Sequence, residues 1–574
     1  MKKYIWIFSI LFFAMTLQVH AQNPVVKQTR LTKQVKQFGV VEFDIVLKTP
    51  FVNPYDQMEI ALDLLLTSSS GKKLELPCYY FSGDGDKSVW KGKFTPQEQG
   101  KFVYSFQLRK QAKIIHKTNV DSFQVDASSH DGFLHVNDYW TLKFDSGKPF
   151  RAIGENVGWE SRTFENPKWT YEYLLPTLSS NGANFFRTWM CPWNLPLVWR
   201  KVDHTNRYVD SDSYFNASGI QKMDELVALC DSLGLYFMLS IDAHGSLIPS
   251  SEWKLNSHNK VNGGPAGTPK EFFSSDASKA MYKNRLRYMI ARWGYSTHIA
   301  AWEFFNEIDN AVFTPTPHDS ILIEHKYITQ WHDEMSTYVK KTDPYKHIVT
   351  TSVSHRNIKG MNDLVNIDLN QKHIYNKTSA IPDTINEYIK RHHKPYVIGE
   401  FGYDWNWDNV KHELGPQFDF DYKRGLWYGM FSPTPILPMT WWWEFFDERK
   451  MTPYFKAIHE INELMLNAGK GSYQQIEIRA DRAEAFSVKC GEIYFVYLLN
   501  KDTLGVVTDV SIALKPGVAI AFDVKAFTPD TREYHNLGSV LRNQNKCVLK
   551  DISVADELIL IISPGENKTG RSSH

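Results

Sequence analysis

The sequence predicts an α/β protein: a (β/α)8 TIM barrel flanked by an N-terminal and a C-terminal β-sandwich. Three observations predict this fold. Residues 22 to about 127 form short runs of alternating apolar and polar side chains separated by turn residues, as in a sandwich. From about 130 to 468, short apolar runs alternate with amphipathic helical segments, as in a barrel. After Gly469 the short alternating strands return.

The chain has 574 residues, which is too long for one hydrophobic core and suggests about three domains. We divide it into a signal peptide, an N-terminal sandwich, a catalytic barrel, a C-terminal sandwich and a disordered tail. Their predicted limits are 1–21, 22–127, 128–468, 469–565 and 566–574, in that order.

The N-terminus carries an export signal. Lys2 and Lys3 precede an apolar run over residues 4–17, and residues 19–21 place small side chains at a cleavage site after Ala21. The run is too short for a transmembrane segment, and no other stretch approaches the necessary length. We therefore expect an exported protein, periplasmic or extracellular, with no transmembrane segment.

Composition narrows the classes of partner. The chain holds 65 basic and 64 acidic side chains, a net charge of +1, which does not favour nucleic acid or an anionic membrane. The five cysteines are scattered and lack a C-x-x-C pair, so we expect free thiols rather than a zinc site or a disulfide framework. The 18 tryptophans fit either a carbohydrate groove or the filling of a large barrel.

Within the barrel, short apolar runs predict eight strands, and segments 220–233 and 277–293 predict amphipathic helices between them. A segment rich in Ser, Asn and Gly, 249–268, predicts a long loop after the third strand. The predicted strands are 150–154, 184–189, 236–241, 299–304, 347–352, 368–373, 396–399 and 436–441.

Two carboxylates close two of these strands. Glu307 ends the run that begins at Trp302, and Glu400 ends the run that begins at Lys394. Strands buried on both faces read as such continuous apolar runs. Both carboxylates should therefore lie at the C-terminal ends of parallel strands, where barrel enzymes place their chemistry. A carboxylate pair so placed is the machinery of glycoside hydrolysis.

Other polar and aromatic residues fall at the ends of the same strand series. Any one of them alone would be weak evidence, but the ordered set is unlikely by chance. The residues are Arg187 on the second strand, His244 on the third, Asn306 on the fourth, His373 and Tyr375 on the sixth, and Trp443 on the eighth, with Trp441 on the same face.

This ordered set resembles glycoside hydrolase clan A, in particular the family-five cellulase and mannanase type. That pattern has Arg on strand two, His on strand three, Asn-Glu on strand four, His-x-Tyr on strand six, Glu on strand seven and Trp on strand eight. The N-terminal sandwich is similar to the immunoglobulin-like domain that precedes such barrels in many uncharacterised bacterial hydrolases. The resemblance implies a retaining glycoside hydrolase that needs no cofactor and acts on a β-linked oligo- or polysaccharide.

Chemistry and resemblance together assign roles. Glu307 would be the general acid, with a raised pKa, and Glu400 the nucleophile, kept ionised by Tyr375 and Arg187. Asn306 would bind the sugar 2-hydroxyl. His244 and His373 would orient the substrate and the carboxylates, and Trp441 and Trp443 would form the floor of the site.

Alternatives remain open at this point. A barrel that binds carbohydrate without catalysis, or a transglycosidase, would carry the same residues. Asp242 and His244 also suggest a rival hypothesis, a metal-dependent barrel hydrolase. The sequence lacks the His-x-His motif that is usual in that class, which disfavours this hypothesis. Glu303 is expected in a structural ion pair. The identity of the sugar and the oligomeric state stay open. Other carboxylates at the same edge are weaker substrate-binding candidates: Glu155, Glu160, Asp242 and Glu444.

Overall fold

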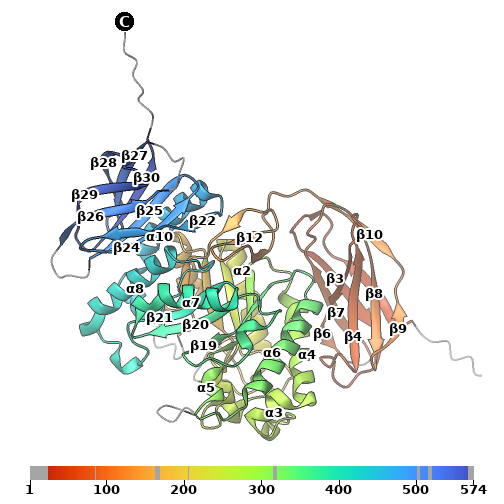
Figure 1. Cartoon of the computed structure of the whole chain (residues 1–574). Helices are drawn as coiled ribbons and strands as arrows, with labels where there is room; N and C mark the ends of the chain where they lie inside the picture. The colour runs from red at the N-terminus through yellow and green to blue at the C-terminus, as the bar shows by residue number, and fades with distance from the viewer. Residues whose placement is uncertain are drawn as a thin grey trace, which may run out of the picture.

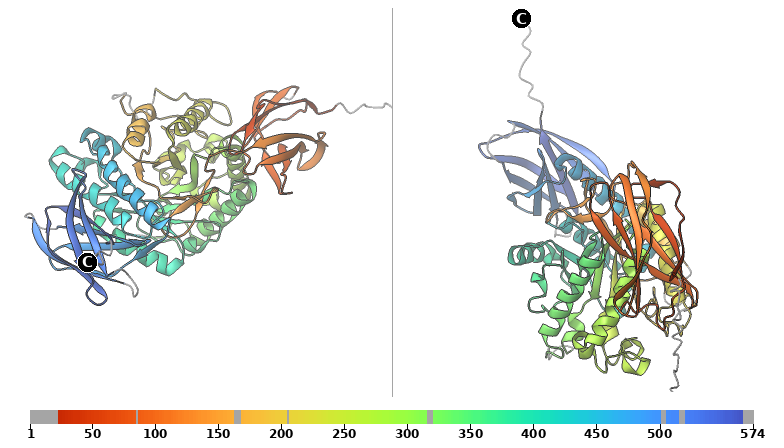
Figure 2. Two further views of the ribbon diagram at one scale, coloured as in Figure 1. Left: turned by 90° about the horizontal axis from the view of Figure 1, so that it is seen from above. Right: turned by 90° about the vertical axis from the view of Figure 1, so that its right-hand side faces the viewer.

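The computed structural model describes residues 23–84, 86–161, 168–203, 206–314, 320–500, 505–514 and 520–565. The predicted signal peptide and C-terminal tail lie outside these residues. Figure 1 shows a central barrel with a strand-rich unit on each side, and Figure 2 shows these two units at opposite ends of the barrel.

The N-terminal unit consists of two sheets that share one hydrophobic core. Phe43 and Trp90 enter that core from one sheet, and Leu64 and Phe106 from the other. The strand orders are β1-β3-β7-β6 and β2-β10-β8-β4-β5, with β9 paired to β8. The strands are β1 (Val25–Arg30), β2 (Val35–Lys36), β3 (Val41–Leu47), β4 (Ile60–Thr67), β5 (Lys73–Pro77), β6 (Tyr79–Gly83), β7 (Ser88–Phe94), β8 (Gly100–Lys110), β9 (Lys113–Lys117) and β10 (Asp121–Asp126).

The barrel strands pair in parallel and in sequence order within two sheets. A small sheet precedes them, formed by β11 (Leu134–Val136), β12 (Leu142–Phe144) and β13 (Pro149–Phe150). The predicted first strand, 150–154, is wrong because Phe150 pairs antiparallel with β12 and the barrel strand begins at Gly154. All eight residues of β17 are buried, as expected for a strand covered on both faces. The barrel strands are β14 (Gly154–Asn156), β15 (Phe185–Trp189), β16 (Tyr236–Ala243), β17 (Ile299–Asn306), β18 (Ile348–Thr350) followed by β19 (Ser352–Val353), β20 (Asn370–Tyr375) and β21 (Tyr396–Gly402).

The prediction of a continuous eighth strand over 436–441 is wrong. The segment instead closes the barrel through isolated parallel bridges, Ile436 with Ala152 and Thr440 with Phe401. Pro438 interrupts the ladder because it has no N–H to donate. Trp443, expected at the end of this strand, begins helix α9 (Trp443–Glu448).

Helices cover the outside of the barrel. Helix α2 shows why they form where they do: Asn216 accepts hydrogen bonds from two backbone N–H groups at its start, and Gly234 ends it at φ 65°. Between β19 and β20 the connection holds only a short 3-10 turn, Met361–Asp363. Besides α9, the helices are α1 (Tyr171–Ser180), α2 (Ala217–Leu233), α3 (Pro269–Ser274), α4 (Asp276–Trp293), α5 (Asp309–Val312), α6 (His325–Thr342), α7 (Ile381–His392), α8 (Gly415–Met430) and α10 (Phe455–Gly469).

The C-terminal unit has a six-stranded sheet, β22-β24-β25-β30-β27-β28, and a three-stranded sheet, β23-β26-β29. Strand β25 is buried on both faces: Val496 lies in the core between the two sheets, while Phe495 and Tyr497 join the core of the barrel. The strands are β22 (Tyr473–Gln475), β23 (Ile478–Ala480), β24 (Glu484–Cys490), β25 (Ile493–Leu499), β26 (Val506–Ala513), β27 (Ala521–Thr528), β28 (Glu533–Leu541), β29 (Lys546–Val554) and β30 (Glu557–Pro564).

The N-terminal unit is attached to the barrel by polar contacts. Arg287 of α4 donates to the buried Asp63 at 2.5 Å. Thr95 donates through its hydroxyl to the Tyr295 carbonyl at 2.7 Å and through its N–H to the Tyr345 hydroxyl at 3.0 Å. All five cysteines belong to the described residues, are buried and form no disulfide, as predicted. Among the described residues, no helix has the length and apolarity needed to cross a membrane.

A buried arginine ties the start of the barrel to its end. The guanidinium of Arg151 donates to four backbone carbonyls, those of Gly429, Met430, Ser432 and Thr434, at 2.8–3.2 Å. The arginine is fully buried. Gly429 and Met430 are the last residues of α8, so Arg151 pairs carbonyls that the helix end and the following turn leave without a partner.

We expect Arg151→Met to lower the free energy of unfolding by about 3–5 kcal/mol, because it leaves several buried carbonyls unpaired. Chemical denaturation measures this loss. Arg391→Met removes an exposed arginine paired with Glu387 on α7 and should change stability by less than about 1 kcal/mol. Equal effects of the two substitutions would contradict the role given to Arg151.

Candidate active site

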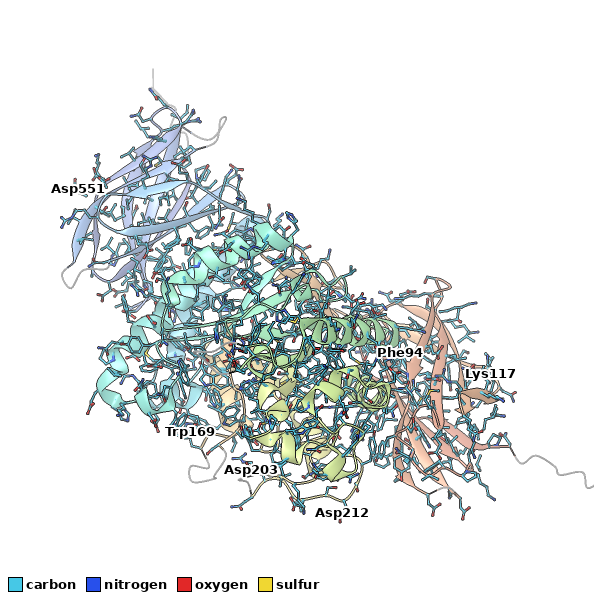
Figure 3. The ribbon with its side chains drawn as sticks, turned by 60° about the horizontal axis from the view of Figure 1, so that its bottom comes forward. Phe94, Lys117, Trp169, Asp203, Asp212 and Asp551 are labelled. Carbon is cyan, nitrogen blue, oxygen red and sulfur yellow. The ribbon has the colours of Figure 1, made fainter. Side chains whose placement is uncertain are left out.

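The C-terminal ends of the barrel strands meet at one end of the molecule. In Figure 1 this end points downward, where α3 and α5 follow β16 and β17; Figure 3 turns it toward the viewer. Parallel strands of a barrel bring their last residues to the same edge. The predicted site residues on β15, β17, β20 and β21 are therefore brought together, and their contacts define the site.

Arg187 joins side chains from four strands. Its guanidinium forms a bidentate pair with Glu303, at 2.6 and 2.9 Å, and donates to Glu400 at 2.7 Å. It also donates to Asn156 at 3.0 Å and to Asn306 at 2.7 Å. Arg187 is completely buried, so these contacts satisfy its charge in place of water. Glu303 takes the structural ion pair expected of it.

Glu400, on β21, is held by two strong donors. Arg187 reaches one carboxylate oxygen, and the hydroxyl of Tyr375 donates to the other at 2.7 Å. Nδ1 of His373 lies 3.3 Å from that second oxygen. Only about 4% of the Glu400 side chain is exposed. The carboxylate is therefore fixed in direction and has little contact with solvent.

Glu307, just after β17, lies in a left-handed backbone conformation with φ 48°. Such a conformation is uncommon for a residue with a side chain and is often found at functional sites. Its N–H donates to the Ser352 hydroxyl at 2.9 Å. The carboxyl contacts Nδ1 of His373 at 2.8 Å through one oxygen and accepts from Asn310 at 2.9 Å through the other.

His373 lies between the two carboxyls. One oxygen of Glu307, one of Glu400 and a ring nitrogen of His373 all lie within 4.8 Å of one another. His244 begins a 3-10 turn after β16, and its Nδ1 is 3.7 Å from Glu307 and 3.4 Å from the Asn306 amide. Both predicted histidines thus lie beside Glu307.

Burial dominates the electrostatics of this cluster. It raises the pKa of Glu307, partly opposed by His244. It also raises the pKa of Glu400, against which the nearby His373, Arg187 and Tyr375 act. Burial lowers the pKa of His373 to about 4, so the ring is neutral near neutral pH. The site therefore holds one permanent positive charge, on Arg187, next to Glu400.

A second network supports Glu307 from α5. Arg356 donates to the amide oxygen of Asn310 at 2.5 Å, which leaves the amide N–H groups to face Glu307. The buried Asp309 accepts from the backbone N–H groups of Ser354 and Arg356 at 2.7 and 3.1 Å. This network holds the segment after β19 against α5 and fixes the orientation of Asn310.

Tryptophan rings form one wall of the site. The rings of Trp441 and Trp443 are 5.0 Å apart, and Trp159 packs edge-on against Trp443 at 5.1 Å. Trp189 lies 5.3 Å from Trp441. A Cβ atom at Gly158 would lie within 3.0 Å of both Trp441 and Trp443, so this glycine allows the rings to approach the backbone.

Asn156 and Asn310 were not predicted. Asn156 ends β14, next to the predicted candidate Glu155, and it contacts Arg187. Asn310 lies three residues after Glu307, but Glu307 has a left-handed φ of 48° and α5 begins only at Asp309. The helical i, i+3 rule therefore does not explain their contact, and the sequence offers no other local signal for it.

The weaker carboxylate candidates are separate from this cluster. One terminal nitrogen of Arg285 donates to both carboxylate oxygens of Asp242, at 3.0 and 3.1 Å. Glu160 pairs with Arg207 at 2.6 Å. Glu155 is buried, and burial raises its pKa well above the ordinary value. The trio of Glu307, His373 and Glu400 is compact enough to bind a cation, but Arg187 already neutralises Glu400 and would repel one.

We expect Arg187→Met to lower the free energy of unfolding by about 3–5 kcal/mol, because Glu303 and Glu400 then remain buried without a positive partner. Chemical denaturation at pH 7 measures the loss. Adding Glu303→Leu to the same chain removes one of the unpaired charges and should recover part of the stability. A double variant less stable than Arg187→Met would contradict this account.

Comparison with known proteins shows which family the barrel resembles. Residues 145–420 match the family model described as Cellulase (glycosyl hydrolase family 5). Residues 34–109 match a domain of unknown function, DUF5060. Among solved structures, a putative glycoside hydrolase from Bacteroides vulgatus has a TM-score of 0.66 at 14% identity. The match covers 93% of this chain and 100% of that one, and it shows a shared fold.

The curated relatives match a smaller share of this chain than that solved structure does. A probable mannan endo-1,4-beta-mannosidase C of Aspergillus terreus is 39% identical over 84 residues, 14% of this chain and 20% of the relative. Mannan endo-1,4-beta-mannosidase 3 of Arabidopsis thaliana is 22% identical over 254 residues, 42% of this chain. The chain thus spans 20% and 55% of the length of these two relatives. Over residues 145–420 the barrel is thus similar to glycosyl hydrolase family 5.

Proposed function

We propose that this protein is a retaining glycoside hydrolase that cleaves a β-linked oligo- or polysaccharide by double displacement. The observation that carries the proposal is the pair of carboxyls, the half-buried Glu307 and the buried Glu400, with oxygens within 4.8 Å of each other. Retaining enzymes hold their carboxyls about 5–5.5 Å apart, whereas inverting enzymes need about 6.5–9.5 Å to admit a water molecule. The short separation supports retention.

The hydrogen bonds around the two carboxyls support different roles for them. Glu400 faces a permanent positive charge on Arg187 and a donated hydrogen bond from Tyr375, and both favour its ionised form. Glu307 accepts from neutral Asn310 and lies beside neutral His373. When the pair holds one proton, that proton therefore resides on Glu307. Glu400 acts as the nucleophile and Glu307 as the general acid.

In the first step a Glu400 oxygen bonds to the anomeric carbon as the glycosidic bond breaks. The proton of Glu307 goes to the leaving oxygen. In the second step Glu307 takes a proton from water, whose oxygen displaces Glu400 from the anomeric carbon. Glu307 is thus protonated for the first step and ionised for the second. Such a change fits a carboxyl whose pKa is raised above its ordinary value.

The surrounding side chains bind and orient the sugar. The amide oxygen of Asn306 is occupied by Arg187, so its N–H groups are directed toward the site, where they donate to the sugar 2-hydroxyl. His244 and His373 position the acid, Glu307. The rings of Trp441 and Trp443 provide the apolar floor under the reacting sugar.

The first substrate to test is a β-1,4-mannan. The curated relatives carry the name mannan endo-1,4-beta-mannosidase, and the family model names cellulases. A gluco- and a manno-configured sugar differ at the 2-hydroxyl, the group we assign to Asn306. β-1,4-Glucan is therefore the comparison that decides between the two sugars.

The remaining parts of the chain are proposed to support export and stability. Residues 1–21 act as the signal peptide, and the units over 22–127 and 469–565 are sandwich domains attached to the barrel. The contacts of Asp63 and Thr95 with the barrel support a scaffolding role for the first unit. The packing of Tyr497 against the barrel supports one for the second.

A panel of β-mannan, β-glucan and aryl β-glycosides tests the function. Wild type should hydrolyse at least one of them with retention, seen by NMR of the first-formed anomer. Glu400→Ala should lose essentially all turnover and remain folded. Glu307→Gln should lose about 10²–10⁴-fold on glycans, and much less on aryl glycosides whose leaving group needs no proton. Full activity in Glu400→Ala would remove the nucleophile assignment.

The pH profile of kcat/KM should be bell-shaped. Activity needs Glu400 ionised and Glu307 protonated, so it falls at low pH through the first pKa and at high pH through the second. Asn310→Ala removes a hydrogen bond that lowers the pKa of Glu307. The alkaline limb should therefore move upward by about 0.5–1 pH unit.

Tyr375→Phe is the matched control for the other limb. It removes the hydrogen bond that lowers the pKa of Glu400, so the acidic limb should move upward while the alkaline limb moves less. If Asn310→Ala shifted the acidic limb instead, the assignment of acid and nucleophile would have to be exchanged.

A further inference from the structure

Two tryptophans are exposed on the connection between β21 and α8. The exposed fractions of Trp405 and Trp407 are 65% and 66%. Within the described residues, they are the two tryptophans among the exposed large apolar side chains. Tryptophan rarely leaves so much of its ring in water, and clustered exposed apolar side chains mark binding surfaces.

The connection that carries these rings is internally ordered. The carboxylate of Asp404 accepts from the N–H of Asn406 at 2.9 Å and from the amide of Asn409 at 2.7 Å. The carbonyl of Asp404 accepts from the indole N–H of Trp442 at 2.7 Å. The ring of Trp407 packs on that of Trp442, with centroids 5.2 Å apart. The two exposed indoles therefore lie on a turn that its own hydrogen bonds and the packing on Trp442 stabilise.

This turn continues directly from the candidate active site. It begins after Gly402, the last residue of β21, only two positions beyond Glu400. A Cβ atom at Gly402 would lie 3.3 Å from the ring of Tyr375, which donates to Glu400. On its other side, Trp442 lies in sequence between Trp441 and Trp443 of the aromatic wall. The exposed rings thus extend the site outward along the surface.

The chemistry of the turn fits a sugar chain. Indole faces pack against the C–H faces of pyranose rings, and polar side chains beside them can pair with hydroxyls. Asn406, Asp408 and Asn409 lie beside the two rings, and Asp408 and Asn409 are exposed. A protein-binding surface would instead have a core depleted in charged residues.

We propose that Trp405 and Trp407 form a distal subsite that stacks on sugar rings of the substrate chain beyond the ring that reacts. This inference rests on the proposed function and deepens it. The subsite binds a β-linked glycan longer than a disaccharide. It acts by holding the chain and makes no contact with the reacting atoms.

The test compares substrates of increasing length. Wild type, Trp405→Ala, Trp407→Ala and the double variant are assayed on β-1,4-linked oligosaccharides of two to six units and on an aryl glycoside of the same sugar. We expect kcat/KM for the longest substrate to fall about tenfold for each ring removed, the loss for about 1.4 kcal/mol of contact. The ratio of kcat/KM for the longest oligosaccharide to kcat/KM for the aryl glycoside should fall by the same factor.

Matched variants separate stacking from folding. Trp407→Tyr keeps a ring and should retain more of the length dependence than Trp407→Ala. Phe81→Ala removes an exposed ring from the N-terminal unit, 49% exposed, and should leave the ratio unchanged. The inference is overturned if the double variant keeps the wild-type ratio. It is also overturned if long and aryl substrates lose activity equally, because the rings would then support the reacting centre or the fold.

Failure of the proposed function would be recognised separately. In that case wild type hydrolyses neither glycans nor aryl glycosides. Binding of β-1,4-linked hexasaccharides to wild type and to the double variant, measured by calorimetry, then decides the inference. Weaker binding by the double variant supports the subsite, and equal binding or no binding by both overturns it.

Discussion

The guanidinium of Arg187 is the interaction on which the site depends. It is the positive charge that allows two carboxylates, Glu303 and Glu400, to be buried together at the centre of the barrel. Without it, each would have to gain a proton or leave the interior, since an isolated buried charge is very costly. The same group contacts Asn156 and Asn306, so the ends of β14, β15, β17 and β21 are held by one side chain.

That single charge also distinguishes two chemically identical carboxyls. Burial pushes the pKa of Glu307 and Glu400 in the same direction. Only Glu400 is hydrogen-bonded to the arginine, and Glu307 is oriented by the neutral side chains of Asn310 and His373. The different surroundings of the two groups therefore follow from which strand faces Arg187. In this way the strand order of the barrel is connected to its proposed acid–base chemistry.

Much of the barrel was predictable because its signals are local. The runs that end at Asn306 and at Glu400 are continuous and apolar, and both form buried parallel strands. The prediction of a strand over 436–441 is wrong because the apolar composition of this segment suits a strand, whereas Pro438 has no N–H to donate and only isolated bridges form. The support of Asn310 by Arg356 was also out of reach, since 46 residues separate them and only the fold brings them together.

The two flanking units differ in how their cores relate to the barrel. The N-terminal core is largely separate: Tyr345 of the barrel enters it, and Tyr79 of the N-terminal unit enters the core of the barrel. In the C-terminal unit, β25 divides its side chains between the two cores, with Tyr497 on the barrel side. Loss of the first unit would leave Arg287 without Asp63 and would expose Tyr345, but most of the apolar core of that unit would be lost with it. The second is part of the barrel's own architecture, and recombination at residue 469 would expose the apolar surface that it covers.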